Sequence, residues 1–259
     1  MASQISNDNS NNLQAPLEFG HSVKESHEGA SLWLRIVSVL IYVGCLIVNG
    51  VIGVAGPNSA GAVSDKFKLY VTPPGFIFSI WGAIYTFIGI TIIYVTIANK
   101  WRPVSYYLWN AINFFNALWV GIWSIGTQNA IIACLFIIIT LPTMLLWLWY
   151  TIYEPEVDSC KEGWKYYLVR NSIAFYLGWV IAATIINFGI VLVYPLQVAQ
   201  KTFTVVFWIV VPVVAITVTV VNFAKQRWNG LLSCLCAWLS VLWALSGALI
   251  TTLDNKNNL

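Results

Sequence analysis

Charged residues are scarce in this sequence, and histidine is nearly absent. The 259 residues include thirteen Lys and Arg, ten Asp and Glu and two His, so that 9% of the chain is charged. Soluble domains carry about 25% charged residues. The composition therefore excludes an ordinary soluble domain, and we expect no nucleic-acid partner.

The apolar stretches hold no Asp, Glu or His at membrane depth. Coupled transporters need a titratable or anionic group near the middle of the membrane, so this absence argues against proton- or sodium-coupled transport. A retinal-binding protein is excluded too, because the last apolar stretch, 229–252, has no lysine for a Schiff base. His21 and His27 lie in a polar N-terminal tail. We therefore predict a protein that is not an enzyme, with no catalytic residue, no metal site and no required cofactor.

The cysteines form neither a disulfide framework nor a metal-ligand set. All five lie in or next to apolar stretches, without the spacing of secreted domains or zinc sites. We interpret them as small buried apolar residues: Cys45, Cys134, Cys160, Cys234 and Cys236.

Long hydrophobic runs are what the sequence does contain. Hydrophobic residues make up 59% of the chain, and the mean hydropathy is +0.75. Stretches long enough to cross a bilayer, about 20 residues each, recur from residue 32 to residue 253. We predict an all-α, polytopic membrane helical bundle with seven spans: 32–55, 74–98, 105–126, 129–152, 166–193, 202–223 and 229–252.

The ends of the spans carry most of the charge. The first 30 residues are polar and rich in Asn and Ser, so they cannot bury enough apolar surface to fold alone. Nine of the thirteen basic residues fall on the N-terminal side of the predicted spans, which favours a cytosolic N-terminus. Arg35 and Arg170 lie near span ends, where we expect their side chains to reach the headgroups.

Tryptophan is abundant, with fourteen residues. Six lie near predicted span ends, where aromatic belts at the membrane surface explain them: Trp33, Trp101, Trp109, Trp149, Trp164 and Trp228. Five lie deeper, where a buried indole N–H needs a hydrogen-bond partner: Trp81, Trp119, Trp123, Trp179 and Trp243.

A double proline precedes an aromatic stripe in segment 71–85. Pro73 and Pro74 can open a helix, because the first helical positions need no N–H partner. Phe78, Trp81 and Tyr85 follow at spacings of three and four, so they project from one helix face. The segment predicts a helix that enters the bilayer with an aromatic wall just inside its mouth.

Amides and indoles share helical stripes in two further spans. Asn116 precedes Trp119 by three residues, and Trp179, Ala183 and Asn187 are four residues apart. Small residues and amides commonly join membrane helices, so helix packing is one interpretation. The other is that the small Ala183, between Trp179 and Asn187, leaves space for a flat ligand to lie against the helix.

Together these elements resemble the motifs of the TspO/MBR family of tryptophan-rich sensory and translocator proteins. The family motif P-P-x-W-x-F-G-P-x-W-T-x-x-Y is similar to residues 73–85, although Phe76 replaces its first tryptophan and its internal proline is missing. The family's N-x-x-W matches Asn116 and Trp119, and its W-x-x-x-A-T-x-x-N matches residues 179–187. The elements keep the family's order over residues 32–193.

The resemblance implies a five-helix bundle with a ligand pocket, capped by the loop between the first two spans. It divides the chain into a disordered tail (1–30), a TspO-like core (31–193) and two extra C-terminal transmembrane helices with a short tail (194–259). Family members bind tetrapyrroles and sterols, so we expect a hydrophobic small-molecule ligand, such as a porphyrin, to be bound, sensed or translocated. The implied pocket residues are Trp81, Tyr85, Asn116, Trp119, Trp179, Ala183 and Asn187, with Pro73, Pro74 and Phe78 at the mouth.

The loop 57–72 is the natural lid of that pocket. Its Lys66 and Lys68 could meet a ligand's propionates, or they could contact solvent and lipid headgroups. Besides the lipid bilayer itself, a second copy of the chain is an expected partner, because Gly50, Gly53 and Gly56 allow close helix contact in a homodimer.

Two other interpretations stay open. The last two spans could dock the protein as a structural subunit of a membrane complex. Alternatively, interior amides could line the pore of an uncoupled small-solute facilitator or channel: Asn49, Asn110, Asn113, Asn116, Asn187 and Asn222.

Overall fold

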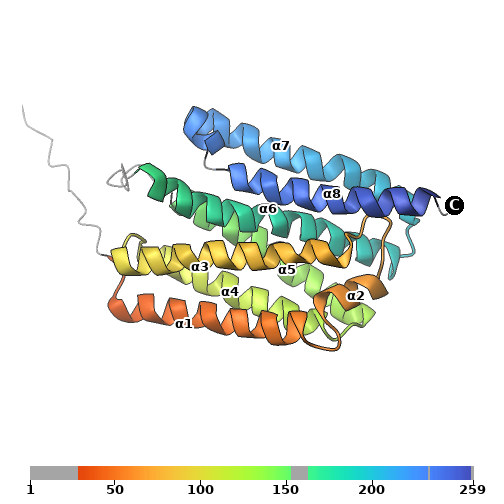
Figure 1. The fold of residues 1–259 in the computed structure, drawn as a ribbon, viewed down its shortest axis with the longest axis horizontal. Helices are drawn as coiled ribbons and strands as arrows, with labels where there is room; N and C mark the ends of the chain where they lie inside the picture. Colours follow the sequence, from red (N-terminus) through yellow and green to blue (C-terminus); the bar gives the residue numbers. More distant parts are fainter. Residues whose placement is uncertain (1–28, 153–162, 233, 258–259) are drawn as a thin grey trace, which may run out of the picture.

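The structure is a computed structural model that describes residues 29–152, 163–232 and 234–257. The predictions for the N-terminal tail, its histidines and Cys160 lie outside these residues. The described chain forms a bundle of long helices that lie side by side (Figure 1). A π-helical segment, Asn49–Val54, continues α1, and a 3-10 turn, Gly75–Ser79, precedes α3. The α-helices are α1 (Leu32–Val48), α2 (Ala60–Lys66), α3 (Ile80–Ala98), α4 (Pro103–Trp123), α5 (Gln128–Thr151), α6 (Gly163–Val193), α7 (Gln200–Leu232) and α8 (Leu235–Asn257).

Six described helical segments are long and apolar enough to cross a membrane: Leu32–Val54, Gly75–Ala98, Gln128–Thr151, Gly163–Val193, Gln200–Val221 and Leu235–Asn255. The protein is therefore an integral, multi-pass membrane protein with an all-helical bundle. Helix α4 is not among the six, although it has 21 residues and packs between α1 and α5. Its asparagines and tyrosines make it more polar than the others. The count of seven spans and the division into five plus two stay predictions.

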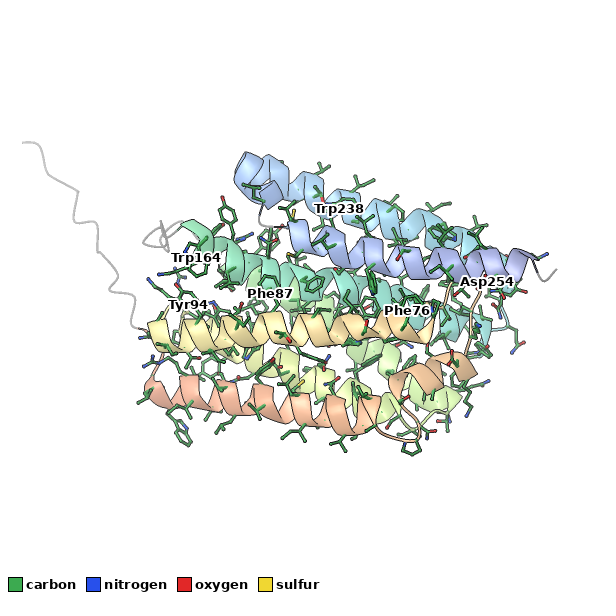
Figure 2. All side chains as sticks on the ribbon, viewed as in Figure 1. Phe76, Phe87, Tyr94, Trp164, Trp238 and Asp254 are labelled. Atoms are coloured by element: carbon green, nitrogen blue, oxygen red, sulfur yellow. The ribbon has the colours of Figure 1, made fainter. Side chains whose placement is uncertain are left out.

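The helices α1, α4, α5, α6 and α3 form a closed group. In this order each packs against the next, and α3 returns to contact α1. Side chains fill the spaces between the ribbons (Figure 2). Helix α8 packs mainly along α6, and α7 contacts both α6 and α8. The α7–α8 pair thus covers the outer side of α6.

Local sequence signals explain several helix ends. The Ser31 hydroxyl accepts a hydrogen bond from the Leu34 N–H at 3.2 Å at the start of α1, and Thr127 caps α5 in the same way. Pro103 occupies the first turn of α4, where its missing N–H costs nothing. Asn99 ends α3 with a left-handed backbone, φ 47°, which asparagine tolerates better than most residues.

Two predicted helix boundaries are wrong. The double proline leads into the 3-10 turn and not directly into α3. The predicted break between residues 223 and 229 is also wrong, because α7 continues to Leu232. The reason lies on α6, where Asn171 donates to the Leu232 carbonyl at 2.8 Å and accepts from the Cys236 N–H at 3.1 Å. One amide thereby caps the end of α7 and the start of α8.

Three tryptophans predicted to form surface belts are buried. Trp33 and Trp164 are indeed exposed, at 73% and 68%, but Trp101, Trp109 and Trp149 are 4% exposed or less. The belt interpretation is wrong for these three, because Trp109 and Trp149 face neighbouring helices and Trp101, in the connection between α3 and α4, packs against Tyr106 and Trp109. The side chain of Trp228 lies outside the described residues.

The two arginines near span ends are held by the bundle. The Arg170 guanidinium is fully buried and lies 3.7 Å from the ring centroid of Trp149. Such cation–π stacking favours arginine inside a bundle, and the expectation that Arg170 reaches the headgroups is wrong. Arg35 is partly buried, and its Nη1 donates to the Thr96 carbonyl at 2.6 Å, which ties α1 to α3.

Candidate functional site

Five aromatic side chains meet between α3 and α6. We call them the aromatic cluster: Phe78, Trp81, Tyr85, Tyr176 and Trp179. Trp81 and Tyr85, one turn apart on α3, stack with their ring centroids 5.2 Å apart and an interplanar angle of 18°. The Trp179 ring stands edge-on to Trp81 at 6.1 Å and to Phe78 at 6.0 Å, and Tyr176 stands edge-on to Trp81 at 5.8 Å. The stripe predicted on α3 therefore faces α6, and its rings have the geometries that aromatic pairs prefer.

Asn116 of α4 provides the polar side of this cluster. Its Oδ1 accepts three hydrogen bonds, from the Tyr85 hydroxyl at 3.0 Å, from Asn49 Nδ2 at 2.8 Å and from the Cys45 thiol at 3.3 Å. These bonds join α1, α3 and α4 at one buried oxygen. They also fix which way the Asn116 amide points, so that its NH₂ group is turned away from these three donors.

Two donors beside the cluster have no hydrogen-bond partner within the described part of the chain. They are Asn116 Nδ2 and Trp179 Nε1, and both side chains are at most 3% exposed. A buried donor without a partner costs about 1–3 kcal/mol. A ligand that presents acceptor atoms at both positions would recover this free energy.

Part of the cluster keeps accessible surface. Phe78, Trp81 and Tyr85 are only partly buried, although their rings contact α4 and α6. Ala183, one turn beyond Trp179, is also partly buried. The accessible parts of these rings are an apolar surface between α3 and α6.

Trp119 and Asn187 lie nearer to α5. The ring centroids of Trp119 and Trp123 lie 5.2 Å apart. The backbone carbonyl of Trp119 accepts a hydrogen bond from the Cys134 thiol of α5 at 3.6 Å. Asn187 Nδ2 donates to the Ile131 carbonyl of α5 at 3.5 Å. Among the described ring contacts and hydrogen bonds, none joins these two side chains to the aromatic cluster.

The double proline lies against α8. A Cβ added to Gly247 of α8 would be 2.9 Å from the Pro73 side chain and 2.8 Å from that of Ile77, so only glycine allows this approach. Pro73 and Pro74 also line a cleft of about 450 Å³ between the lid and α8. Of the three predicted mouth residues, Phe78 is the one that joins the aromatic cluster.

The predicted lid, 57–72, contains α2 and is tied down from α4 and α6. The Trp123 indole donates to the Ala60 carbonyl at 3.3 Å, and the Lys66 ammonium donates to the Gly126 carbonyl at 2.7 Å. The Tyr194 hydroxyl donates to the Lys68 carbonyl at 3.0 Å, and burial raises the pKa of Tyr194 above its usual value of 10.0. Tyr194 therefore stays a neutral donor at ordinary pH.

Helix α8 holds the other end of this segment. Thr251 donates to the Thr72 carbonyl at 2.8 Å, and Thr252 donates to the Tyr70 carbonyl at 3.0 Å. The Trp243 indole donates to the Ile77 carbonyl at 2.9 Å, just before α3 begins. Two side-chain hydrogen bonds thus join the lid to α8, and a third joins α8 to the 3-10 turn that follows the double proline.

Sequence reasoning missed two members of the site. Tyr176 lies three residues before Trp179, so the same helical spacing that marked Trp179 could have found it. Tyr42 of α1 donates from its hydroxyl to the Tyr85 carbonyl. A Cβ on Gly89 would lie 2.7 Å from the Tyr42 hydroxyl oxygen, so this glycine permits the close crossing of α1 and α3. A long-range contact of this kind leaves no periodic signal.

The interior amides largely bind one another or their own helices. Asn49 donates to Asn116, and Asn113 donates to the Trp109 carbonyl at 2.8 Å one turn earlier. All three asparagines are at most 9% exposed. In the described part of the chain, four cysteines carry free thiols, and no group of three or more His, Cys, Asp or Glu side chains could hold a metal ion.

Comparison with known proteins gives one family. A family model described as TSPO-like protein matches residues 34–258. No curated protein and no solved structure matches the chain. The match covers nearly the whole sequence, and it includes α7 and α8, which lie beyond the motifs in residues 32–193.

Proposed function

The chain belongs to the TSPO-like protein family, and we propose that it binds a flat hydrophobic ligand of the tetrapyrrole or sterol kind within the membrane. The ligand packs against the aromatic cluster, with the stacked Trp81 and Tyr85 on one side and Trp179 at its edge. Sensing or translocation of the ligand would follow from this binding step.

One observation carries the proposal. Trp179 Nε1 and Asn116 Nδ2 are buried donors that lack a partner among the described residues, and both lie beside partly accessible aromatic rings. Aromatic faces supply apolar contact area, while a few directed donors fix the orientation of the ligand. The propionates of a porphyrin or the hydroxyl of a sterol would supply the acceptor atoms.

The α5 side supplies a second row of contacts in this proposal. Trp119 Nε1 and Asn187 Oδ1 also lack a partner in the described part of the chain. With Ala183 they would contact the far end of a ligand larger than the aromatic cluster itself. We assign Pro73 and Pro74 a role in shaping the lid.

A binding role accounts for the interior better than a pore does. A facilitator needs polar groups that face an aqueous path, but the amides of Asn49 and Asn116 bind each other inside the bundle. Membership of the family also favours binding or transport over catalysis.

A titration with protoporphyrin IX tests the proposal. The full chain is purified in detergent, and binding is followed by the absorbance of the porphyrin, which does not depend on the number of tryptophans. Trp179→Phe keeps an aromatic ring in the cluster but removes the indole N–H. We expect it to weaken binding about tenfold, because a lost hydrogen bond to a charged acceptor costs about 1.5 kcal/mol.

Trp164→Phe is the matched control, because Trp164 is 68% exposed at the start of α6. It should bind the porphyrin as the unmodified protein does. If the unmodified protein, Trp179→Phe and Trp164→Phe bound the porphyrin with equal affinity, the ligand would not contact the Trp179 indole N–H. A parallel titration with cholesterol, read as displacement of the porphyrin, separates the tetrapyrrole class from the sterol class.

A further inference from the structure

A polar cleft lies at the end of the bundle where α8 meets the lid. It has a volume of about 450 Å³, within the range of about 300–1,000 Å³ that is usual for small-molecule sites. Its walls come from the end of α2, from the lid and from the last turns of α8. The lining residues are Asp65, Lys68, Thr72, Pro73, Pro74, Thr251, Asp254 and Asn255.

The charges in this cleft have mixed sign with an excess of carboxylate. Asp65 and Asp254 come from two different elements, α2 and α8, and Lys68 is the one ammonium among the residues of the lining. All three side chains are exposed to solvent at the cleft. The negative end of the α8 dipole lies in the same place and further favours a cation there. The cleft therefore suits a ligand that carries both an ammonium group and an anionic group.

The walls of the cleft are fixed by hydrogen bonds. The Thr251 hydroxyl donates to the Thr72 carbonyl at 2.8 Å, so α8 and the lid cannot separate without breaking this bond. The same hydroxyl also lies 3.5 Å from the Gly247 carbonyl one turn earlier. Thr251 and Thr72 are both at most 5% exposed. The cleft is thus a formed feature between two packed elements.

The cleft lies at the level where a membrane span ends. The apolar segment Leu235–Asn255 ends at the cleft, and the segment Gly75–Ala98 begins one residue after Pro74. Figure 2 shows Asp254 near the C-terminal end of α8, at the same end of the bundle as α2 in Figure 1. Lipid headgroups occupy this depth of the bilayer.

We propose that the polar cleft binds a phosphoethanolamine group, and that its source is the headgroup of an aminophospholipid. The primary ammonium lies between the carboxylates of Asp65 and Asp254, and the phosphate meets the ammonium of Lys68. The charge-assisted hydrogen bonds that a primary ammonium makes with carboxylates are among the stronger ones, and α2 and α8 each supply one carboxylate to the cleft.

The same lining disfavours the other common headgroups. A choline group has no N–H to donate and is recognised by aromatic rings, but none of the residues that line the cleft is aromatic. A serine headgroup adds a carboxylate, which the charges of Asp65 and Asp254 would repel. The site should therefore distinguish ethanolamine lipids from both choline and serine lipids.

Native mass spectrometry of the full chain tests this specificity. The protein is released from detergent in the presence of equal amounts of dioleoyl phosphatidylethanolamine, phosphatidylcholine and phosphatidylserine, with a chelator present to remove divalent cations. We expect about fivefold more ethanolamine lipid than choline lipid to stay bound, because both headgroups are cationic but only ethanolamine donates hydrogen bonds to the two exposed carboxylates. The double variant Asp65→Asn/Asp254→Asn should lose this preference, whereas Asp254→Glu, which keeps the charge, should retain it.

Lys68→Gln separates the two halves of the site. It should lower the retention of all three lipids without changing the ratio of ethanolamine to choline lipid, because the phosphate is common to them. Lys201→Gln is the matched control, since Lys201 is an exposed lysine at the start of α7 that does not line the cleft. The Lys201→Gln variant should retain all three lipids in the same amounts as the unmodified protein.

A competition with soluble phosphoethanolamine identifies the source of the group. Displacement of the lipid at millimolar concentration would support the site and assign it to a soluble ligand, and resistance to displacement would support the lipid. Equal retention of ethanolamine and choline lipids by the unmodified protein would overturn the proposal. A preference that survives in Asp65→Asn/Asp254→Asn would overturn it as well.

Discussion

Gly178 of α6 permits a close approach between α6 and α8. A Cβ added there would lie 2.3 Å from Ser240 Oγ and 2.5 Å from the carbonyl oxygen of Ala237. The serine side chain can rotate away, but the backbone carbonyl cannot. Gly178→Ala therefore requires the two helices to move apart by about 1 Å, to reach an ordinary contact distance of about 3.5 Å.

The cost of this movement follows from packing. Inserting a methyl group into a well-packed contact costs about 1–3 kcal/mol, while replacing glycine by alanine within a helix returns about 0.5–1 kcal/mol. Gly44→Ala on α1 is the matched control, because a Cβ at Gly44 meets no atom of another element within 4 Å. The difference in the free energy of unfolding between the two alanine variants cancels the helix preference, and we expect it to be about 1–3 kcal/mol.

Unfolding in mixed micelles, followed by circular dichroism as the fraction of sodium dodecyl sulfate rises, measures this difference. Gly44→Ala should unfold at the same fraction as the unmodified protein or a higher one, and Gly178→Ala at a lower one. Since Trp179 is the next residue, the shift of α6 should also weaken the binding of protoporphyrin IX. If the two alanine variants prove equally stable, α8 does not contact α6 at this distance and the reasoning fails.

Three further predictions concern single contacts. Asn171→Ala leaves the end of α7 and the start of α8 uncapped, so the same unfolding assay should show a loss of about 1–3 kcal/mol. Arg170→Lys loses the planar stack on Trp149, and we expect a loss of about 1 kcal/mol in that assay; unchanged stability would mean that the stack contributes nothing. Thr251→Val keeps the shape of the side chain but removes the bond to Thr72, so hydrogen exchange of the lid amides should accelerate, and exchange rates like those of the unmodified protein would contradict this.

Helical periodicity in the sequence predicts the core of the site. The spacing of Phe78, Trp81 and Tyr85 predicts three rings on one side of this segment. The structure places Phe78 in the 3-10 turn and the other two on α3, and it directs all three toward α6. Trp179 was found by the same reasoning on α6. Periodicity succeeds here because a buried helix face must repeat about every 3.6 residues whatever its partner is.

Periodicity does not identify the partner of a face. Trp149 lies near a span end, where the position alone favours contact with headgroups, yet it packs on Arg170 of another helix. The end of α7 was mispredicted for the same reason, because it is stabilised by Asn171, about 60 residues earlier in the chain. Pairings between distant segments depend on the whole bundle, and a local pattern cannot encode them.

The contacts of α8 with the lid bear on how a ligand reaches the aromatic cluster. On the side of α4 and α6, the lid is already held by Trp123, by the Lys66 bond to Gly126 and by Tyr194. Helix α8 adds direct bonds to the lid from Thr251 and Thr252. Its Trp243 binds the 3-10 turn that follows, and Gly247 lets Pro73 pack against α8. The proposed hydrophobic ligand therefore has two routes: passage between helices from the bilayer, or entry after α8 releases the lid. Faster porphyrin binding by Thr251→Val would select the second route, and an unchanged rate would select the first, because a bond that holds the lid has no influence on passage between helices.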